Sequence, residues 1–356
     1  RRTLAALGAR VTTAHHPTGP SESAAAVLDH VRPHGHLVVP LGNGEPVALL
    51  DAIETAAQNG EIEGVTVHQM HALHDRRYLH GEFGDRLRHV SYFLSHITRP
   101  CFQKGTVDLV PNHFSEVFSH ITRRANDPLV IASAAPPDAH GYFSLGVSAD
   151  YTSSFIGRAR FFLEVNPQMP RTFGRNQIHV SQVAGWFMND RPLTEVTPPP
   201  METVDHTIAA MVADRIPDGA TLQTGIGGIP SQIATLLAEG PHGDFGVHSE
   251  MFTTGLMRLH LAGKVTNRKG TAFDGMSITT FAAGTPDLYE WLHENREVRF
   301  LPVRVVNSPD LIARNRHMVT INGALAVDLA GQVVADTISG TQFSGVGGHE
   351  DFVSGP

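Results

Sequence analysis

The sequence has a single cysteine, Cys101, and no run of about 18 uncharged apolar residues. One cysteine excludes an intramolecular disulfide and a cysteine cage for zinc, and it fits a reducing compartment. The missing apolar run argues against a membrane-spanning helix, and the apolar stretch within the first twenty residues is too short for a signal peptide. We therefore expect a cytoplasmic protein that binds no membrane.

Positive charge is also scarce, since 27 Lys and Arg face 35 Asp and Glu and the formal net charge is −8. Such a chain has no general basic field that would attract nucleic acid, so an anionic ligand must be held by local groups. The 22 histidines include the run His68, His71, His74 and His80, but no His-Glu-x-x-His or mixed His/Cys motif occurs. We expect no metal centre and no permanently bound cofactor.

The length of 356 residues and a hydrophobic content of 41% favour two domains, each with its own core. Three consecutive prolines, 198–200, cannot lie in a helix or a central strand. We place an N-terminal domain at 1–196, a proline-rich linker at 197–202 and a C-terminal domain at 203–356. The missing initiator methionine and the abrupt end suggest a piece of a longer product, truncated at its C-terminus.

Short β-branched or apolar runs alternate with segments of helical period on both sides of the linker, which predicts an α/β fold with largely parallel sheets. Two segments, from His34 and from Asp218, share an order of strand, glycine turn, proline and helix. A second strand then opens on Gly-Val in each, at Gly64 and at Gly246. The match suggests two similar domains that arose by duplication of one βαβ unit.

The second unit, LQTGIGGIPSQIATLLAEGPHGDFGVHSEMFTTG, predicts a strand at 220–224, a tight turn at 225–229 and a helix whose first turn holds Pro230. Free N–H groups of the turn could hold an anion. A right-handed crossover makes the next strand parallel and leaves Glu250 at its carboxyl end. Because ligands of open α/β sheets bind beyond these strand ends, the turn and Glu250 should face one crevice.

Each of these features also has an ordinary explanation. Most glutamates at strand ends are merely solvated, and a lone Gly-x-Gly-Gly turn is a weak signal. A dinucleotide site is disfavoured, because Pro230 stands where the G-x-G-x-x-G pattern needs its third glycine. Met251 is expected to fill core space, and Lys269 is expected to lie in a solvated turn.

Longer motifs weigh against these ordinary explanations. They are SADYTSSF, EVNPQMPRTFG, IHVSQV, LQTGIGGIP, GVHSEMFTTG, INGALAVDLAGQVVAD and GTQFSGVGGHEDF, and they are spread over most of the chain. With them the sequence resembles the acetyl-CoA hydrolase/transferase family, and within it the 4-hydroxybutyrate and butyryl-CoA:acetate CoA-transferases. The resemblance implies a CoA-transferase-like fold, acyl-CoA and a small carboxylate as substrates, coenzyme A as a substrate only, and a homo-oligomer.

The resemblance also implies roles for individual residues. Glu250 matches the nucleophile, and Gln223 matches a position beside the reacting acyl group. The residues that match CoA-contacting positions are Gly225, Ile226, Gly227, Gly228, Ile229, Leu325, Gly347 and Gly348. The sequence departs from the family pattern at His349, where glutamine is usual, and at Thr254, where Asp or Asn is common. Relatives also continue for roughly 70 more residues.

The chemistry expected of Glu250 follows from its residue type. A glutamate has an ordinary pKa of about 4.3, so it is expected to be ionised at neutral pH and to need no adjacent base. Attack on an acyl-CoA thioester would give a mixed anhydride and CoA thiolate, and return of the thiolate would release the acid and leave glutamyl-CoA. The turns at 225–229 and 345–348 are suited to donating N–H groups to the oxyanions of these steps.

Two alternatives stay open at the level of the sequence. If water reaches the anhydride or the glutamyl thioester, the same residues make a short-chain acyl-CoA hydrolase. If the missing C-terminal residues are needed for activity, the chain is a catalytically silent CoA-binding subunit.

Overall fold

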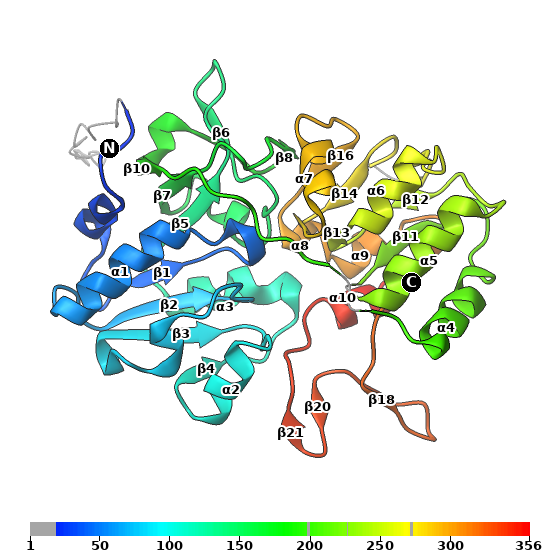
Figure 1. The fold of residues 1–356 in the computed structure, drawn as a ribbon, viewed down its shortest axis with the longest axis horizontal. Coiled ribbons are helices and arrows are strands. Elements are labelled where there is room, and N and C mark those ends of the chain that lie inside the picture. The colour runs from blue at the N-terminus through cyan, green and yellow to red at the C-terminus, as the bar shows by residue number, and fades with distance from the viewer. Residues whose placement is uncertain (1–18, 198–199, 226, 271–272) are drawn as a thin grey trace, which may run out of the picture.

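The computed structural model describes residues 19–197, 200–225, 227–270 and 273–356. A seven-stranded sheet occupies the N-terminal half, in the order β10-β7-β5-β1-β2-β3-β4, and all its neighbouring strands are parallel (Figure 1). Its strands are β1 (His36–Val38), β2 (Val65–Gln69), β3 (Leu87–Ser91), β4 (Val107–Leu109), β5 (Leu129–Ala134), β7 (Arg160–Val165) and β10 (Val183–Met188). The helices of this half are α1 (Val47–Asn59), α2 (Thr98–Gln103) and α3 (Val117–Arg124).

The interior strand β5 shows that both faces of this sheet are covered. All six residues of β5 are buried. Val130 packs into one core with Ile121 of α3, whereas Ile131 packs into another with Ile53 of α1. Successive side chains of a strand point to opposite faces, so a strand covered on both faces is apolar at most positions. The polar exception in β5 is Ser133, whose Oγ donates a hydrogen bond to the carbonyl of Glu45 at 3.1 Å.

The C-terminal half is also built from short parallel strands. Its sheets are β12-β11-β17, β14-β16-β8 and the pair β13-β15. The strands are β8 (Phe173–Gly174), β11 (Thr221–Thr224), β12 (Gly246–Val247), β13 (Met251–Phe252), β14 (Ser277–Thr279), β15 (Phe281–Ala282), β16 (Val298–Phe300) and β17 (Met318–Ile321). The helices are α4 (Thr203–Ala213), α5 (Gly228–Glu239), α6 (Thr254–Leu261), α7 (Pro286–Leu292), α8 (Val303–Val306), α9 (Pro309–Ile312) and α10 (His349–Val353). The predicted α/β class with largely parallel sheets is confirmed.

Antiparallel pairing occurs between a few short strands. The strand β6 (Tyr142–Ser144) pairs with β9 (Gln177–His179), and β7 and β8 lie between them in the chain. Two hairpins follow β17 and precede α10 in the chain, and both project from the body of the molecule (Figure 1). They are β18 (Ala326–Val327) with β19 (Val333–Val334) and β20 (Thr337–Ile338) with β21 (Thr341–Gln342). Within the described ranges, no helix combines the length and the apolar character that a membrane crossing requires.

The two segments that share a sequence pattern have the same local topology. The order β1, α1, β2 places two parallel neighbours around a helix, and the order β11, α5, β12 does the same. Gly227 precedes α5 with φ of 134°, a conformation that L side chains rarely adopt, which explains a glycine there. The predicted βαβ units are therefore confirmed, whereas their origin by duplication stays a hypothesis.

The predicted division at 197–202 also stays a prediction. The described residues between β10 and α4 form neither helix nor strand, and Pro198 and Pro199 lie outside the described ranges. However, Phe173 and Gly174 pair with β16 and so extend a sheet of the C-terminal half. A Cβ on Gly174 would lie 2.0 Å from the carbonyl oxygen of Phe300, so the close approach of these strands requires a glycine.

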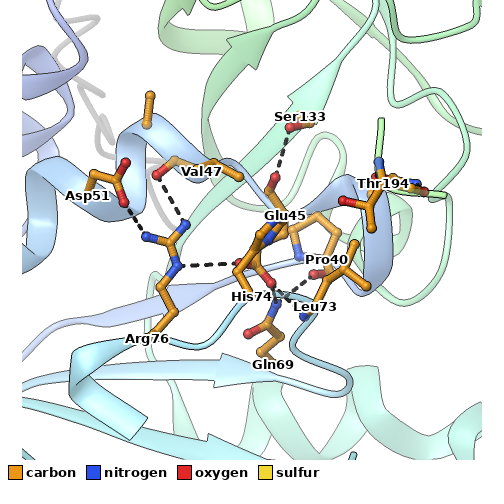
Figure 2. Close-up of polar contacts among 12 residues, drawn as sticks. Pro40, Glu45, Val47, Asp51, Gln69, Leu73, His74, Arg76, Ser133 and Thr194 are labelled. Atoms are coloured by element: carbon orange, nitrogen blue, oxygen red, sulfur yellow. Dashed lines mark hydrogen bonds and ion pairs between the residues drawn. The ribbon is translucent and has the colours of Figure 1, made fainter. Parts of the chain in front are cut away.

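A buried carboxylate fills the strand end of the first unit. Glu45 follows the turn after β1 and is 0% exposed (Figure 2). Its carboxylate accepts hydrogen bonds from Gln69 Nε2, Leu73 N and His74 Nδ1, each at 3.0 Å, and it faces Arg76 Nε at 3.5 Å. Burial alone would raise the pKa of Glu45, but the bond from His74 and the charge of Arg76 lower it below its ordinary value. The network thus holds an ionised carboxylate inside the fold.

Replacing Arg76 with alanine is expected to destabilise the protein by about 3–5 kcal/mol, because it leaves the charge of Glu45 buried without its cation. The matched control is Arg77→Ala, since Arg77 pairs with Glu82 at 2.9 Å at the surface. That control should cost at most about 1 kcal/mol. Urea unfolding at neutral pH measures the free energy of unfolding of both variants. Equal losses in this free energy would show that the buried pair contributes no more to stability than the surface pair.

Candidate active site

Glu250 lies in the short link between β12 and β13. Its carbonyl oxygen accepts hydrogen bonds from Thr280 N at 3.0 Å and Thr279 Oγ1 at 2.9 Å, so the link is tied to the neighbouring strand end. The sequence placed Glu250 at the carboxyl end of a strand that runs parallel to 220–224. The pairing of β11 with β12 confirms that placement.

The residues next to Glu250 point away from its carboxylate. His248 is 0% exposed and bonds through Nε2 to the carbonyl of Val306 at 2.7 Å. Burial lowers the pKa of His248 to about 4, so its ring is neutral at physiological pH. Ser249 Oγ donates to the carbonyl of Met251 at 2.7 Å. Both side chains therefore support the backbone, and neither is placed as a base for Glu250.

The carboxylate of Glu250 meets two groups that are distant in sequence. Asn307, at the end of α8, donates through Nδ2 to Glu250 Oε2 at 2.6 Å. Gly348 packs so closely that a Cβ on it would lie 1.5 Å from Oε2 and 2.3 Å from Asn307 Nδ2. Glycine at position 348 is therefore required for the carboxylate to occupy this place.

Burial raises the pKa of Glu250 to about 7, although the hydrogen bond from Asn307 opposes the shift. The nearby carboxylate of Asp351 raises this pKa further. The expectation that Glu250 is fully ionised at neutral pH is therefore wrong, because it took the pKa of an exposed glutamate. A half-buried carboxylate loses part of its hydration and becomes a stronger base, and its attacking form predominates only above the shifted pKa.

A cavity of about 150 Å³ opens at Glu250. Its lining residues are Gln223, Thr224, Gly225, Glu250, Met251, Phe281, Asn322, Gly348 and His349. The structure thus brings the predicted Gln223, Gly225, Glu250 and Gly348 to one place. Gln223 Nε2 donates to Asn322 Oδ1 at 3.1 Å, while Gln223 Oε1 and Thr224 Oγ1 are buried without a partner among the described residues.

The glycine turn differs in one respect from the expectation of free N–H groups. Gly225 N donates to the carbonyl of Ile321 at 3.0 Å, so this amide is already used by β17. Gly227, Gly228 and Ile229 form the start of α5 and do not line the cavity. Ile226 lies outside the described residues.

Two further predicted CoA contacts, Leu325 and Gly347, are not among the residues that line the cavity. The carbonyl of Gly347 accepts a hydrogen bond from Phe114 N at 2.9 Å. Leu325 is 38% exposed beside the β18-β19 hairpin, and its N–H donates to Val334 O at 2.8 Å. The contacts of Leu325 and Gly347 with CoA stay predictions.

Several residues at the site were not found from the sequence. Asn307 stands in an unremarkable stretch, RVVNSPD, and only the fold brings it to Glu250. Met251 is 5% exposed, as expected of a core residue, yet it also lines the cavity. Asp351 could have been noticed, because it lies three residues after Gly348 within the motif GVGGHEDF.

The expectation of a solvated turn at Lys269 is wrong. Lys269 is 0% exposed, and its Nζ donates to the carbonyl of Val247 at 3.2 Å and to that of Met276. Burial lowers the pKa of Lys269 to about 7. A long apolar stem allows a lysine to cross the core when carbonyl groups meet its end.

Across the described ranges, no group of three or more His, Cys, Asp or Glu side chains is arranged to hold a metal ion.

Comparison with known proteins gives this geometry a context. A succinyl-CoA:cyclohexane-1-carboxylate CoA transferase of Geobacter metallireducens is 37% identical over 90% of this chain and 72% of its own length. A 4-hydroxybutyrate coenzyme A transferase of Clostridium kluyveri is 36% identical over 94% of this chain and 77% of its own. Among solved structures, RipA from Yersinia pestis superimposes with a TM-score of 0.87 at 32% identity, over 94% of this chain and 77% of that one.

A second solved structure, a 4-hydroxybutyrate CoA-transferase from Porphyromonas gingivalis, gives a TM-score of 0.77 at 31% identity, over 94% of this chain and 76% of that one. These structures confirm the predicted CoA-transferase-like fold. The acetyl-CoA hydrolase/transferase N-terminal domain matches residues 21–205, and the C-terminal domain of the same name matches residues 284–356. The chain therefore belongs to the acetyl-CoA hydrolase/transferase family.

Proposed function

We propose that this protein is a CoA-transferase that moves CoA between a short-chain acyl-CoA and a small carboxylate through Glu250. The observation that carries the proposal is the Glu250 carboxylate, which lines a small cavity together with Gln223 and Gly348. The relatives, which are named CoA transferases, support the same reaction.

The proposed reaction begins with a carboxylate oxygen of Glu250, which bonds to the acyl carbon while the carbon–sulfur bond breaks and its electron pair leaves on CoA thiolate. The thiolate then bonds to the Glu250 carbonyl carbon, and the bond to the acyl carboxylate breaks. The acid leaves, and glutamyl-CoA remains. A second carboxylate reverses both steps, so no proton or redox equivalent is consumed.

The surroundings of Glu250 suit each of these steps. Asn307 Nδ2 can donate a hydrogen bond to the glutamyl oxygen and stabilise its negative charge whenever that charge forms during the reaction. A cavity of about 150 Å³ supports a short acyl chain rather than a long one. Because the half-buried carboxylate lies in the wall of a small cavity, water has limited room beside the anhydride and the thioester, which favours transfer over hydrolysis.

The direct test is intact-mass and peptide analysis after incubation with acetyl-CoA or butyryl-CoA. We expect a mass gain of one CoA less one water, located at Glu250 and removed by added acetate. Release of free CoA at the same rate with and without acetate would indicate a hydrolase. Binding of CoA without any acyl exchange would indicate a silent subunit.

We expect the kcat/KM of exchange to rise with pH through a midpoint of about 7, because only ionised Glu250 attacks and its pKa in the fold is raised to about 7. The activity should be low near pH 5.5 and reach a plateau above about pH 8. A pH profile of initial rates, with the stability of the protein checked at each pH, measures this midpoint. A midpoint near pH 4.5 would contradict the raised pKa of Glu250.

The predicted homo-oligomer and cytoplasmic location are retained as part of the proposal. Light scattering of the purified protein and fractionation of cells that express it would test them.

A further inference from the structure

A second carboxylate, Asp351, lies behind the Glu250 site. Asp351 is on α10, three residues after Gly348, and is 4% exposed. Asn307 Nδ2 lies 3.2 Å from Asp351 Oδ2 and 2.6 Å from Glu250 Oε2. The two protons of this amide can therefore reach two different carboxyl groups, and Asn307 is held between them.

The other side of Asp351 is fixed by the N-terminal half. Ser115 donates twice, from Oγ to Asp351 Oδ1 at 2.7 Å and from N to Asp351 Oδ2 at 3.1 Å. The neighbouring Phe114 N bonds to the carbonyl of Gly347 at 2.9 Å. The segment just before α3 thus anchors the turn that ends at Gly348, and Asp351 has little freedom to rotate.

From this chain of contacts we infer that Asp351 is a positioning residue, which orients Asn307 toward Glu250 and whose negative charge opposes ionisation of Glu250. This inference rests on the proposed function of Glu250. Asp351 does not line the cavity, so it acts through Asn307 and through its charge. The charge of Asp351 makes ionised Glu250 a stronger base, and it also lowers the fraction of Glu250 that is ionised. Both the basicity and the ionised fraction affect the rate of nucleophilic attack.

Two titratable groups near this pair are His113 and His349. His113 lies on the Ser115 side and favours the charge of Asp351. His349 lines the cavity with Glu250. Burial raises the pKa of Asp351 despite the bonds from Ser115. Asp351 is the neighbouring charge that raises the pKa of Glu250, so removing it has a defined direction of effect.

The test compares Asp351→Asn with Glu350→Gln. Asparagine keeps the shape of the side chain and one oxygen for Asn307, but it removes the charge. Glu350 is the adjacent carboxylate on α10, is exposed, and contacts Ser354 Oγ at 3.2 Å. Glu350→Gln therefore removes a charge of the same sign without touching Asn307 and should leave exchange unchanged.

We expect Asp351→Asn to move the midpoint of the kcat/KM profile down by about one pH unit, to lower kcat above the midpoint, and to change KM for acyl-CoA by less than about twofold. Asp351→Ala, which also loses the acceptor for Asn307, should lower kcat at least about tenfold further. A midpoint unchanged in Asp351→Asn, or moved equally in Glu350→Gln, would overturn the inference. An equal loss in the alanine and asparagine variants would show that the oxygen does not orient Asn307.

A titration without turnover separates this inference from the proposed function. Protein labelled with carbon-13 at the glutamate δ-carboxyl gives an NMR signal for Glu250, assigned by its loss in Glu250→Gln. If the wild-type protein shows no exchange, the proposed function fails, and the midpoint of this signal still decides the role of Asp351. A downward shift in Asp351→Asn supports the role, and an unchanged midpoint rejects it.

Discussion

Replacing Glu250 with alanine is expected to lower the rate of CoA exchange by about 10⁴-fold or more, because the proposed reaction has no other group that can carry CoA. The measurement is transfer of label from carbon-14 acetate into acyl-CoA, with acyl-CoA in excess. Exchange that continues at the wild-type rate would reject Glu250 as the nucleophile and the proposed mechanism with it.

The same position offers a control for folding. Glu250→Gln keeps the shape of the side chain and an oxygen for Asn307, and it is expected to be inactive but no less stable. The pKa of Glu250 is raised in the folded protein, so its ionised form is disfavoured by folding and this penalty grows as pH rises from about 4.5 to 7. At pH 8 the variant should gain up to about 3 kcal/mol in the free energy of unfolding. A clear loss of stability would mean that the carboxylate supports the fold.

The second large effect is expected from Gly348→Ala. The backbone of Gly348 has φ of −98°, which any residue can adopt, so the new methyl group causes no backbone strain. Its Cβ would lie 1.5 Å from Glu250 Oε2 and would push the carboxylate away from Asn307. A displacement of about 1 Å costs roughly a hundredfold in rate, and we expect at least that loss in kcat/KM.

Gly345→Ala is the comparison for this variant. It lies in the same turn, but its Cβ would have its nearest neighbours, Phe93 Cα and Tyr92 O, at 3.2 Å. We expect it to lose less than about tenfold, because its neighbours must move by only a few tenths of an ångström. Similar losses in both variants would indicate that the turn as a whole, and not the contact with Glu250, sets the rate.

The sequence predicted the elements whose patterns are local. The strand at β11, the proline in the first turn of α5 and the place of Glu250 beyond β12 all follow from hydrophobic period, turn chemistry and the handedness of the crossover. The motif around Gly348 lies at the same cavity, since Gly348 packs against the Glu250 carboxylate, whereas its predicted contact with CoA stays a prediction.

The parts that the sequence did not predict depend on contacts between distant segments. Asn307 and Asp351 reach Glu250 from α8 and α10, and Ser115 reaches Asp351 from the other half of the chain. The raised pKa of Glu250 and the burial of Lys269 depend on the density of atoms around them. Neither quantity has a signature in a short stretch of residues.

The two glycine turns follow equivalent strands, β1 and β11, but the carboxyl ends of these strands have different roles. Beyond β1, the residue before the proline is Glu45, and the fold supplies its own cation for it in Arg76. Beyond β11, the residue before the proline is Ile229, and the neighbouring strand end keeps an open cavity at Glu250. Inherited substitutions should therefore sort by position: those at the first turn reduce how much folded protein accumulates, and those at the second leave a well-folded but inert molecule.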